Sequence, residues 1–416
     1  MGTLIKPFRG LRPEVGRAAE VAAPPYDVLS SDEARQMVTA DGGKPWSFLH
    51  ISKPEIDLQE DVDPYAPAVY AKAAENLGRM LERGVLERDA EPSYYVYRLT
   101  MPTGQGVHVQ TGLVATASVF YYDNNRIKKH EFTRPDKEDD RVRQIEATNA
   151  QTGPVLLAYP ASTTADALID AIAQGEPAAD VLTDSGIRHQ IWVCADTGQV
   201  DAITRCFDGM EALYIADGHH RSAAASRVAA ARRREDVTQS SEYFLAVIFP
   251  HHQMKILDYN RVVKELNGMG VKEFLGKLRD AFLVEPAAGR VSLDRSGVFG
   301  MYLKEQWYRL TIRPELIPSD PVARLDVSLL SDHLLAPVLG ITDLRRDKRI
   351  DFVGGIRGLS ELEARVDSGE MAVAFALHPT RMDQLMAVAD SNNVMPPKST
   401  WFEPKLADGL VSHVLD

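Results

Sequence analysis

The segment LYIADGHHRSAAA, residues 213–225, places chemically capable residues between an apolar run and an alanine-rich run. These residues are Asp217, Gly218, His219, His220 and Arg221. Arginine binds phosphate through a planar fork of N–H donors, and histidines add donors whose charge responds near neutral pH. Glycine lets the backbone approach a bound group closely. These residue types together predict a site for an anionic ligand such as a phosphate.

The neighbouring residues predict the elements that position this site. ALYIA is typical of a strand, and HHRSAAASRVAAARRR is strongly helix-forming, so Asp217 and Gly218 are expected in a strand-to-helix turn. The amides at a helix N-terminus carry the positive end of the helix dipole and bind anions. Two alternatives stay open, since Asp217 could only cap the helix, and an aspartate with two histidines could bind a metal. Adjacent histidines diverge by about 100° on a helix, which opposes a shared ion.

A second charged segment, RIKKHEFTRPDKEDDR at 126–141, contains the residue types that phosphoryl transfer needs. Lys128 and Lys129 are candidate phosphate ligands, Glu131 is the candidate general base, and Arg141 is a candidate substrate ligand. The alternative is a solvated, salt-bridged loop and helix. Thr148 and Asn149 follow and could contact the substrate, or they could belong to a helix end at Gly153 and Pro154.

Two proline-containing segments provide further candidates. In VAAPPYDVLS, Tyr26 and Asp27 follow two prolines and could face a substrate amine, or the segment could only lead into a helix. Near the end, MPPKSTWFEPK carries the candidate phosphate ligands Lys398, Ser399 and Thr400, in a segment that either closes over a site or serves as a docking arm. His50, inside WSFLHIS, is expected to be a buried core histidine.

Composition restricts the class of protein. The 416 residues carry a net charge of −12, which opposes binding to nucleic acid or an anionic membrane surface. No apolar run approaches the roughly 20 residues of a membrane span, and no secretory signal is expected. Two cysteines fit a reducing cytoplasm. The GxxxxGK[ST] phosphate loop, GxGxxG, GxSxG and HExxH motifs are absent from the sequence.

The hydrophobic pattern predicts alternating strands and helices. Strands are expected in 154–160, 188–196 and 212–218, with helices at 163–173 and 198–208 between them. Other expected elements are a helix at 68–86, a hairpin through 93–122, a helix opened by Pro135, strands in 242–250, 254–260 and 297–312, and a long helix at 326–339. We expect an N-terminal domain at 1–265, with the DGHHR residues, and a C-terminal α/β domain with a closing tail at 266–416.

DGHHR, after a strand and before an alanine-rich helix, resembles the motif of free-serine kinases related to the ParB and sulfiredoxin fold. The segments KPFRGLRP, VAAPPYDVLS, IKKHEFTRPDKEDDR, ATNAQTGPV and MPPKSTWFEPK resemble a large bacterial and archaeal family catalogued as a domain of unknown function. The resemblance implies a mixed α/β fold, with mixed sheets flanked by helices and a ParB/sulfiredoxin-like nucleotide-binding core. It also implies ATP or ADP as phosphoryl donor and free L-serine or a related amino acid as acceptor. Mg²⁺, with Asp217 as ligand, is expected to take part.

Two other functions are kept as alternatives. One is a ParB-like regulator that senses a nucleotide, and the other is a nucleotide-independent lyase or hydrolase acting on an amino-acid derivative. The expected partners are a small-molecule substrate and a nucleotide, and a homodimer is left open.

Overall fold

The computed structural model describes residues 2–104, 106–234 and 239–416. The chain divides into two compact units. Unit 1 comprises Met1–Met254 with Pro404–Asp416, and unit 2 comprises Lys255–Glu403. Compared with the expected division into 1–265 and 266–416, the boundary lies earlier and the last segment belongs to the first unit. Unit 2 is therefore an insertion in the sequence of unit 1.

Unit 1 is built on a large mixed sheet with the strand order β6-β11-β8-β12-β5-β4-β10-β9, and β1 also pairs with β5. Its strands are β1 (Ile5–Lys6), β4 (Tyr94–Thr103), β5 (Gly106–Ser118), β6 (Ile127–Lys128), β8 (Val155–Tyr159), β9 (Ala179–Leu182), β10 (Arg188–Cys194), β11 (Leu213–Asp217) and β12 (Tyr243–Pro250). The expected hairpin is formed by β4 and β5, although Gln105 in its turn lies outside the described residues. β12 runs parallel to β8, whereas β11 runs antiparallel to it.

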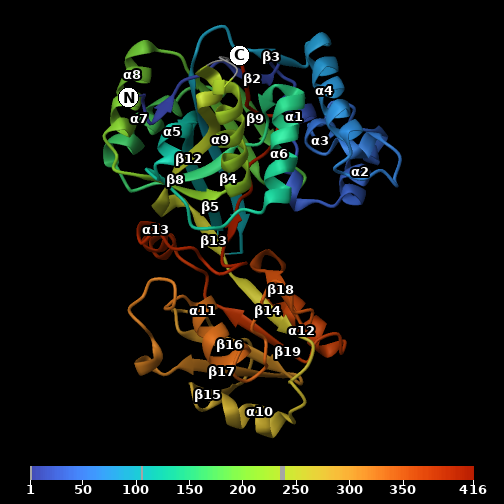
Figure 1. Cartoon of the computed structure of the whole chain (residues 1–416), viewed down its shortest axis with the longest axis vertical. Helices are drawn as coiled ribbons and strands as arrows, with labels where there is room; N and C mark the ends of the chain where they lie inside the picture. The colour runs from blue at the N-terminus through green and yellow to red at the C-terminus, as the bar shows by residue number, and fades with distance from the viewer. Residues whose placement is uncertain (1, 105, 235–238) are drawn as a thin grey trace. The chain divides into compact units, whose positions relative to one another are not determined.

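The helices of unit 1 are α1 (Ala18–Val21), α2 (Ser31–Thr39), α3 (Leu49–Ser52), α4 (Pro67–Glu82), α5 (Val119–Asp123), α6 (Pro135–Thr148), α7 (Thr163–Ile172), α8 (Thr197–Asp208) and α9 (His219–Arg234). They contribute to two cores: α5, α7, α8 and α9 pack into the core of the large sheet, whereas α2, α3 and α4 form a second core to one side (Figure 1). Ile169 of α7 and Phe207 of α8 share the main core with Trp192 of the sheet. Ala225 of α9 is also buried there, so its small side chain lets this helix pack close. α6 and α9 lie side by side and bury Ile145 against Ala224.

A smaller sheet in unit 1 has the order β3-β2-β21-β7. Its strands are β2 (Gly10–Pro13), β3 (Leu86–Arg88), β7 (Ala150–Gln151) and β21 (Ser412–Val414). Because β21 pairs with both β2 and β7, the last segment of the chain is built into the first unit.

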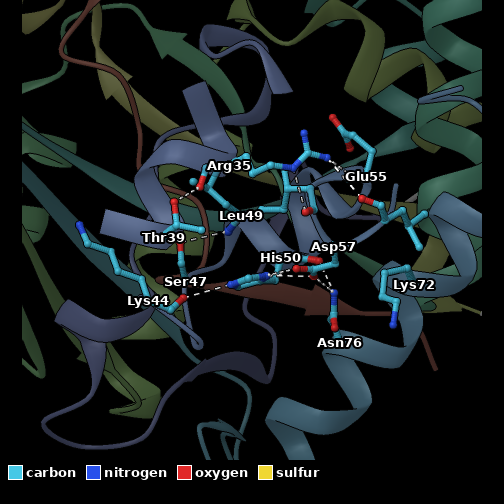
Figure 2. Close-up of polar contacts among 12 residues, drawn as sticks. Arg35, Thr39, Lys44, Ser47, Leu49, His50, Glu55, Asp57, Lys72 and Asn76 are labelled. Atoms are coloured by element: carbon cyan, nitrogen blue, oxygen red, sulfur yellow. Dashed lines mark hydrogen bonds and ion pairs between the residues drawn. The ribbon is translucent and has the colours of Figure 1, made fainter. Parts of the chain in front are cut away.

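His50 is a core histidine, as predicted, at 8% exposure. Its Nδ1 lies 2.9 Å from both carboxylate oxygens of Asp57, and its Nε2 lies 3.1 Å from the Lys44 carbonyl oxygen (Figure 2). Asn76 of α4 donates hydrogen bonds to Asp57 and to the His50 carbonyl oxygen. This histidine therefore joins helices α3 and α4 to the preceding turn.

Unit 2 contains an antiparallel sheet with the order β15-β17-β16-β19-β14-β18 and a separate β13-β20 pair. Its strands are β13 (Lys255–Leu257), β14 (Tyr259–Val263), β15 (Phe282–Ala287), β16 (Val298–Leu303), β17 (Gln306–Ile312), β18 (Ile350–Gly354), β19 (Val373–Leu377) and β20 (Trp401–Glu403). Its helices are α10 (Val271–Leu278), α11 (Asp326–Leu330), α12 (Leu359–Asp367) and α13 (Met382–Asp390).

The long helix expected at 326–339 is interrupted. The α-helical part ends at Leu330, and Ser331–Leu335 continue as a π-helix. Pro337 follows within a turn of this segment and has no N–H to donate, so it cannot continue a regular α-helical ladder. The predicted fold class, mixed α/β with mixed sheets flanked by helices, is confirmed. Among the described helices, none has both the length and the apolar character needed to cross a lipid bilayer.

Candidate functional site

The strand-to-helix turn forms where the sequence predicts it. β11 ends at Asp217, α9 begins at His219, and Gly218 joins them with φ of +95°. A Cβ atom at Gly218 would lie 3.2 Å from Arg221 Nε and 3.3 Å from Val155 Cα. The Gly218 amide donates to Asp217 Oδ1 at 2.8 Å. Both the backbone conformation and the space around it therefore require glycine.

Arg221 is a buried cation shared by carboxylates. Its side chain is 11% exposed, and its Nη2 lies 3.6 Å from Asp27 Oδ2 and 3.9 Å from Asp217 Oδ1. Nη1 donates a hydrogen bond to the Pro154 carbonyl oxygen. Burial lowers the pKa of Arg221, but the charges of Asp27 and Asp217 raise it by more, so the guanidinium stays charged.

Asp217 is held ionised by neighbouring cations. Its Oδ2 lies 3.4 Å from Nζ of Lys405, in the segment after unit 2. Burial alone raises the pKa of Asp217, but the charges of Lys405 and Arg221 lower it well below its usual range. Lys405 is part of the MPPKSTWFEPK segment, but its contact with Asp217 could not be predicted, because 188 positions separate the two residues and no local pattern joins them.

The two histidines accept hydrogen bonds from the backbone of the loop before α6. His219 Nε2 accepts from the His130 amide at 3.4 Å, and His220 Nε2 accepts from the Arg134 amide at 3.1 Å. In the neutral rings Nδ1 therefore carries the proton. Burial lowers the pKa of His219 well below its usual value and also lowers that of His220. Desolvation therefore favours the neutral ring in both residues, and for His219 it opposes the expectation of a charge that responds near neutral pH.

The same loop places Glu131 beside the turn. Glu131 Oε2 lies 3.8 Å from His219 Nδ1, and its side chain is half exposed. The two predicted lysines lie near aromatic rings: Lys129 Nζ is 3.8 Å from the Tyr122 ring centre, and Lys128 Nζ is 6.0 Å from that of Tyr214. Their role as phosphate ligands stays a prediction.

A small cavity of about 30 Å³ is lined in part by Arg221. Its lining comprises Tyr26, Ser52, Arg141, Gln144, Ile145, Gln151, Thr152, Gly153, Val155, Arg221, Phe244, Leu245 and Asp408. This volume suits one or two water molecules, so neither a nucleotide nor an amino acid fits inside. A ligand would reach Arg221 from the side of Asp27, Asp217 and Lys405, whose side chains are 40%, 35% and 25% exposed.

The structure brings predicted substrate residues to this cavity. Arg141 lies 3.9 Å from the Tyr26 ring centre and pairs with Asp140 at 2.7 Å. Asp408, which sequence reasoning missed, is 2% exposed, and burial raises its pKa to about 7 although Arg221 opposes the shift. The cavity therefore combines two guanidinium groups with a carboxyl group that titrates near neutral pH.

Other predicted residues are engaged elsewhere in the fold. The Thr148 hydroxyl lies 2.7 Å from the Gln144 carbonyl oxygen, and Asn149, with φ of +49°, ends α6 and donates to the Leu415 carbonyl oxygen. These two residues form the end of α6, which stops there and not at Gly153 and Pro154. Neither residue is part of the cavity lining. Thr152 and Gly153 line it instead.

Lys398, Ser399 and Thr400 belong to unit 2. The Ser399 hydroxyl donates to the Pro396 carbonyl oxygen at 2.6 Å, and Lys398 Nζ lies 5.5 Å from the Tyr259 ring centre. The Lys398 carbonyl oxygen accepts from buried Arg261 at 3.0 Å. These contacts hold the loop together, and its role in phosphate binding stays a prediction.

The surroundings of Asp217 do not favour a resident magnesium ion. Its carboxylate already faces Lys405, Arg221 and the Gly218 amide, which compete with a divalent cation for the carboxylate oxygens. Among the described residues, no group of three or more histidine, cysteine or acidic side chains could hold a metal ion. The expectation that Asp217 binds Mg²⁺ stays a prediction, and no chemical step below depends on it.

Comparison with curated proteins finds no match. Among solved structures, a conserved hypothetical protein from Pyrococcus furiosus is similar at 14% identity and a TM-score of 0.35, over 72% of this chain and 94% of that one. A free serine kinase in complex with AMP is similar at 12% identity and a TM-score of 0.35, over 71% and 92%. SbnI with a C-terminal truncation, from Staphylococcus aureus, is similar at 10% identity and a TM-score of 0.38, over 72% and 86%.

One family model matches residues 5–328, which include the turn at 217–218, the loop before α6 and Arg221. The chain belongs to the family described as "Protein of unknown function (DUF1015)".

Proposed function

We propose that this protein is a small-molecule kinase that transfers a phosphoryl group from ATP or ADP to the hydroxyl of free L-serine or a related amino acid. The observation that carries the proposal is the charged, buried Arg221 beside the glycine turn that opens α9. A helix N-terminus offers amides to phosphate oxygens, and an arginine fork adds charge-assisted hydrogen bonds. Lys405 adds a second cation at the same turn.

Each neighbouring group has a role in this proposal. The acceptor hydroxyl gives its proton to Glu131 while its oxygen attacks the terminal phosphorus, and the bond from that phosphorus to the nucleotide oxygen breaks. His219 is neutral, with Nδ1 toward Glu131, so it orients that carboxylate and does not carry the proton itself. Catalysis then comes from positioning and charge neutralisation, without a covalent enzyme intermediate.

The proposed acceptor site lies beside Tyr26, Asp27 and Arg141. Asp27 is the more exposed partner of Arg221, so an incoming phosphate can take its place on the guanidinium. The released carboxylate would pair with the ammonium group of an amino acid, and Arg141 would pair with its carboxylate. Because the cavity lined by Tyr26 and Arg141 is too small for an amino acid, one of these two side chains has to move when the acceptor binds.

The test is product analysis. The full chain is incubated with ATP or ADP, Mg²⁺ and a panel of hydroxy amino acids, and ³¹P NMR follows the products. The proposal predicts a phosphorylated amino acid, and it predicts that Glu131→Gln slows turnover by about a hundredfold or more while ADP still binds. Asp136→Asn is the matched control, since Asp136 is an exposed carboxylate of the same segment that pairs with Arg134.

Other outcomes would reject the kinase assignment. Nucleotide binding without a phosphorylated product would favour the nucleotide-sensing regulator. Turnover of an amino-acid derivative without nucleotide would favour the lyase or hydrolase. Equal turnover in wild type and Glu131→Gln would remove Glu131 from its role as general base.

A further inference from the structure

The large sheet of unit 1 carries an open depression of about 660 Å³ that shares no lining residue with the cavity beside Arg221. It is lined by Arg98, Thr100, Val109, Thr111, Asp170, Gln190, His252 and Gln253. Arg98 of β4 lies opposite Thr111 of β5 and Gln190 of β10, so these side chains form one row across three strands. The volume falls in the range of small-molecule sites, roughly 300–1,000 Å³.

Arg98 is held in a fixed position without a counter-charge. Its Nε donates to Thr111 Oγ1 at 3.0 Å, and its guanidinium lies 5.0 Å from the ring centre of Trp192. Across residues 2–104, 106–234 and 239–416, no carboxylate lies within ion-pair distance of Arg98, and its terminal nitrogens have no hydrogen-bond partner. A half-buried guanidinium that the protein orients but does not neutralise favours an anionic ligand.

A second donor is oriented by the same residue. The Gln253 side-chain oxygen accepts a hydrogen bond from the Thr111 amide at 2.8 Å. This contact fixes the side-chain amide, and its NH₂ group has no partner within the part of the chain that the structure describes. Thr111 therefore positions both Arg98 and Gln253, one through its hydroxyl and the other through its backbone.

We propose that this depression binds a small organic anion, a carboxylate or a phosphate ester, with Arg98 as the charged ligand and Gln253 as a second donor. Asp170, in α7, is the one carboxylate among its lining residues, and it disfavours a polyanion such as nucleic acid. The lining otherwise consists largely of hydroxyl, amide and imidazole groups, which suits a small polar ligand that bears a single anionic group. The site is independent of the proposed kinase function.

The proposal is tested by titrating the full chain with inorganic phosphate and, separately, with acetate at constant ionic strength. The emission of Trp192 reports binding at Arg98, and Trp192→Phe identifies its share of the signal. Probes this small are expected to bind with millimolar dissociation constants. We expect a saturable change with at least one probe, and the probe that binds more tightly shows which oxyanion the site prefers.

Variants locate the binding site. Arg98→Gln is expected to weaken binding about tenfold or more, and Gln253→Ala by several-fold, since charge-assisted contacts are the stronger ones. Arg188→Gln is the matched control, because Arg188 lies on the adjacent strand but pairs bidentately with Asp180. Arg221→Lys should leave the affinity at Arg98 unchanged. This result would show that the observed binding does not take place at the turn before α9.

Two results would overturn the proposal. One is the absence of saturable binding by either probe, and the other is an unchanged affinity in Gln253→Ala together with Arg98→Gln. If Arg98→Gln does not fold, Arg98→Lys keeps the charge and removes the fork, and unchanged affinity in Arg98→Lys and Gln253→Ala overturns the proposal equally.

Discussion

Replacing Asp408 with asparagine removes a titratable group from beside Arg221 and should change how stability depends on pH. In the folded protein burial raises the pKa of Asp408 to about 7, against about 3.9 in an unfolded chain. The folded state therefore binds more protons than the unfolded state between about pH 4 and pH 7, and stability is lost as pH rises through that window. Above about pH 7 the loss is complete.

The magnitude follows from the pKa difference. Each unit corresponds to about 1.4 kcal/mol, so raising the pH from 5 to 8 should cost wild type about 3 kcal/mol through this group alone. Asp408→Asn keeps the shape and can still accept a hydrogen bond but does not titrate. The free energy of unfolding of the variant minus that of wild type should therefore increase by about 3 kcal/mol as the pH rises from 5 to 8.

The assay is urea denaturation of both proteins at pH 5, 6, 7 and 8 in one buffer system. Buried histidines make stability rise with pH, which is opposite to the effect of Asp408. Because both proteins contain the same histidines, their contribution cancels in the difference between the two proteins. Asp61→Asn, at an exposed aspartate, is the control, and its stability should follow that of wild type from pH 5 to pH 8. A difference between wild type and Asp408→Asn that stays constant from pH 5 to pH 8 would refute the assignment of Asp408 as a buried carboxyl group that ionises near neutral pH.

Four further substitutions, at three positions, test other parts of the structure. Gly218→Ala forces a side chain into the +95° turn and should cost about 1–2 kcal/mol in urea denaturation and weaken ADP in calorimetry; unchanged values would show that the turn tolerates a Cβ atom. Arg221→Gln should cost about 2–4 kcal/mol, less than a fully buried pair because Asp27 and Asp217 are 40% and 35% exposed. Arg221→Lys keeps the charge and should remain folded while binding ADP about tenfold more weakly, so wild-type affinity would contradict the site. His50→Leu removes the ring contacts with Asp57 and with the Lys44 carbonyl, although Asn76 still donates to Asp57, and should cost about 2–3 kcal/mol without changing ADP affinity; wild-type stability would show that these ring contacts add nothing.

The turn at residues 217–218 could be predicted because its signals are local. An apolar strand run, a glycine and an alanine-rich helical run follow one another directly in the sequence. The burial of His50 was predictable for the same reason, since apolar residues surround it on both sides. Mixed α/β architecture followed from alternation of such runs, and the structure bears it out.

Asp27 and Glu131 were predicted as site residues, but the atoms of the turn that each partner meets could not be predicted, because the partners come from distant segments. Asp27, Glu131, Lys405 and Asp408 meet Arg221, His219 or Asp217 only after the sheets form. The immediate contacts of a charged side chain could not be predicted from the local pattern either. Lys129 carries a charge that suits phosphate, yet its ammonium lies against the Tyr122 ring, where burial lowers its pKa.

The order in which the chain is synthesised matters for the turn before α9. Lys405 and Asp408 leave the ribosome only after the whole of unit 2 has been made, although Asp217 and Arg221 are translated much earlier. Until then Asp217 lacks its lysine, and β2 lacks the strand that completes its small sheet. Nascent chains that stop within residues 255–403 should therefore present an incomplete anion site.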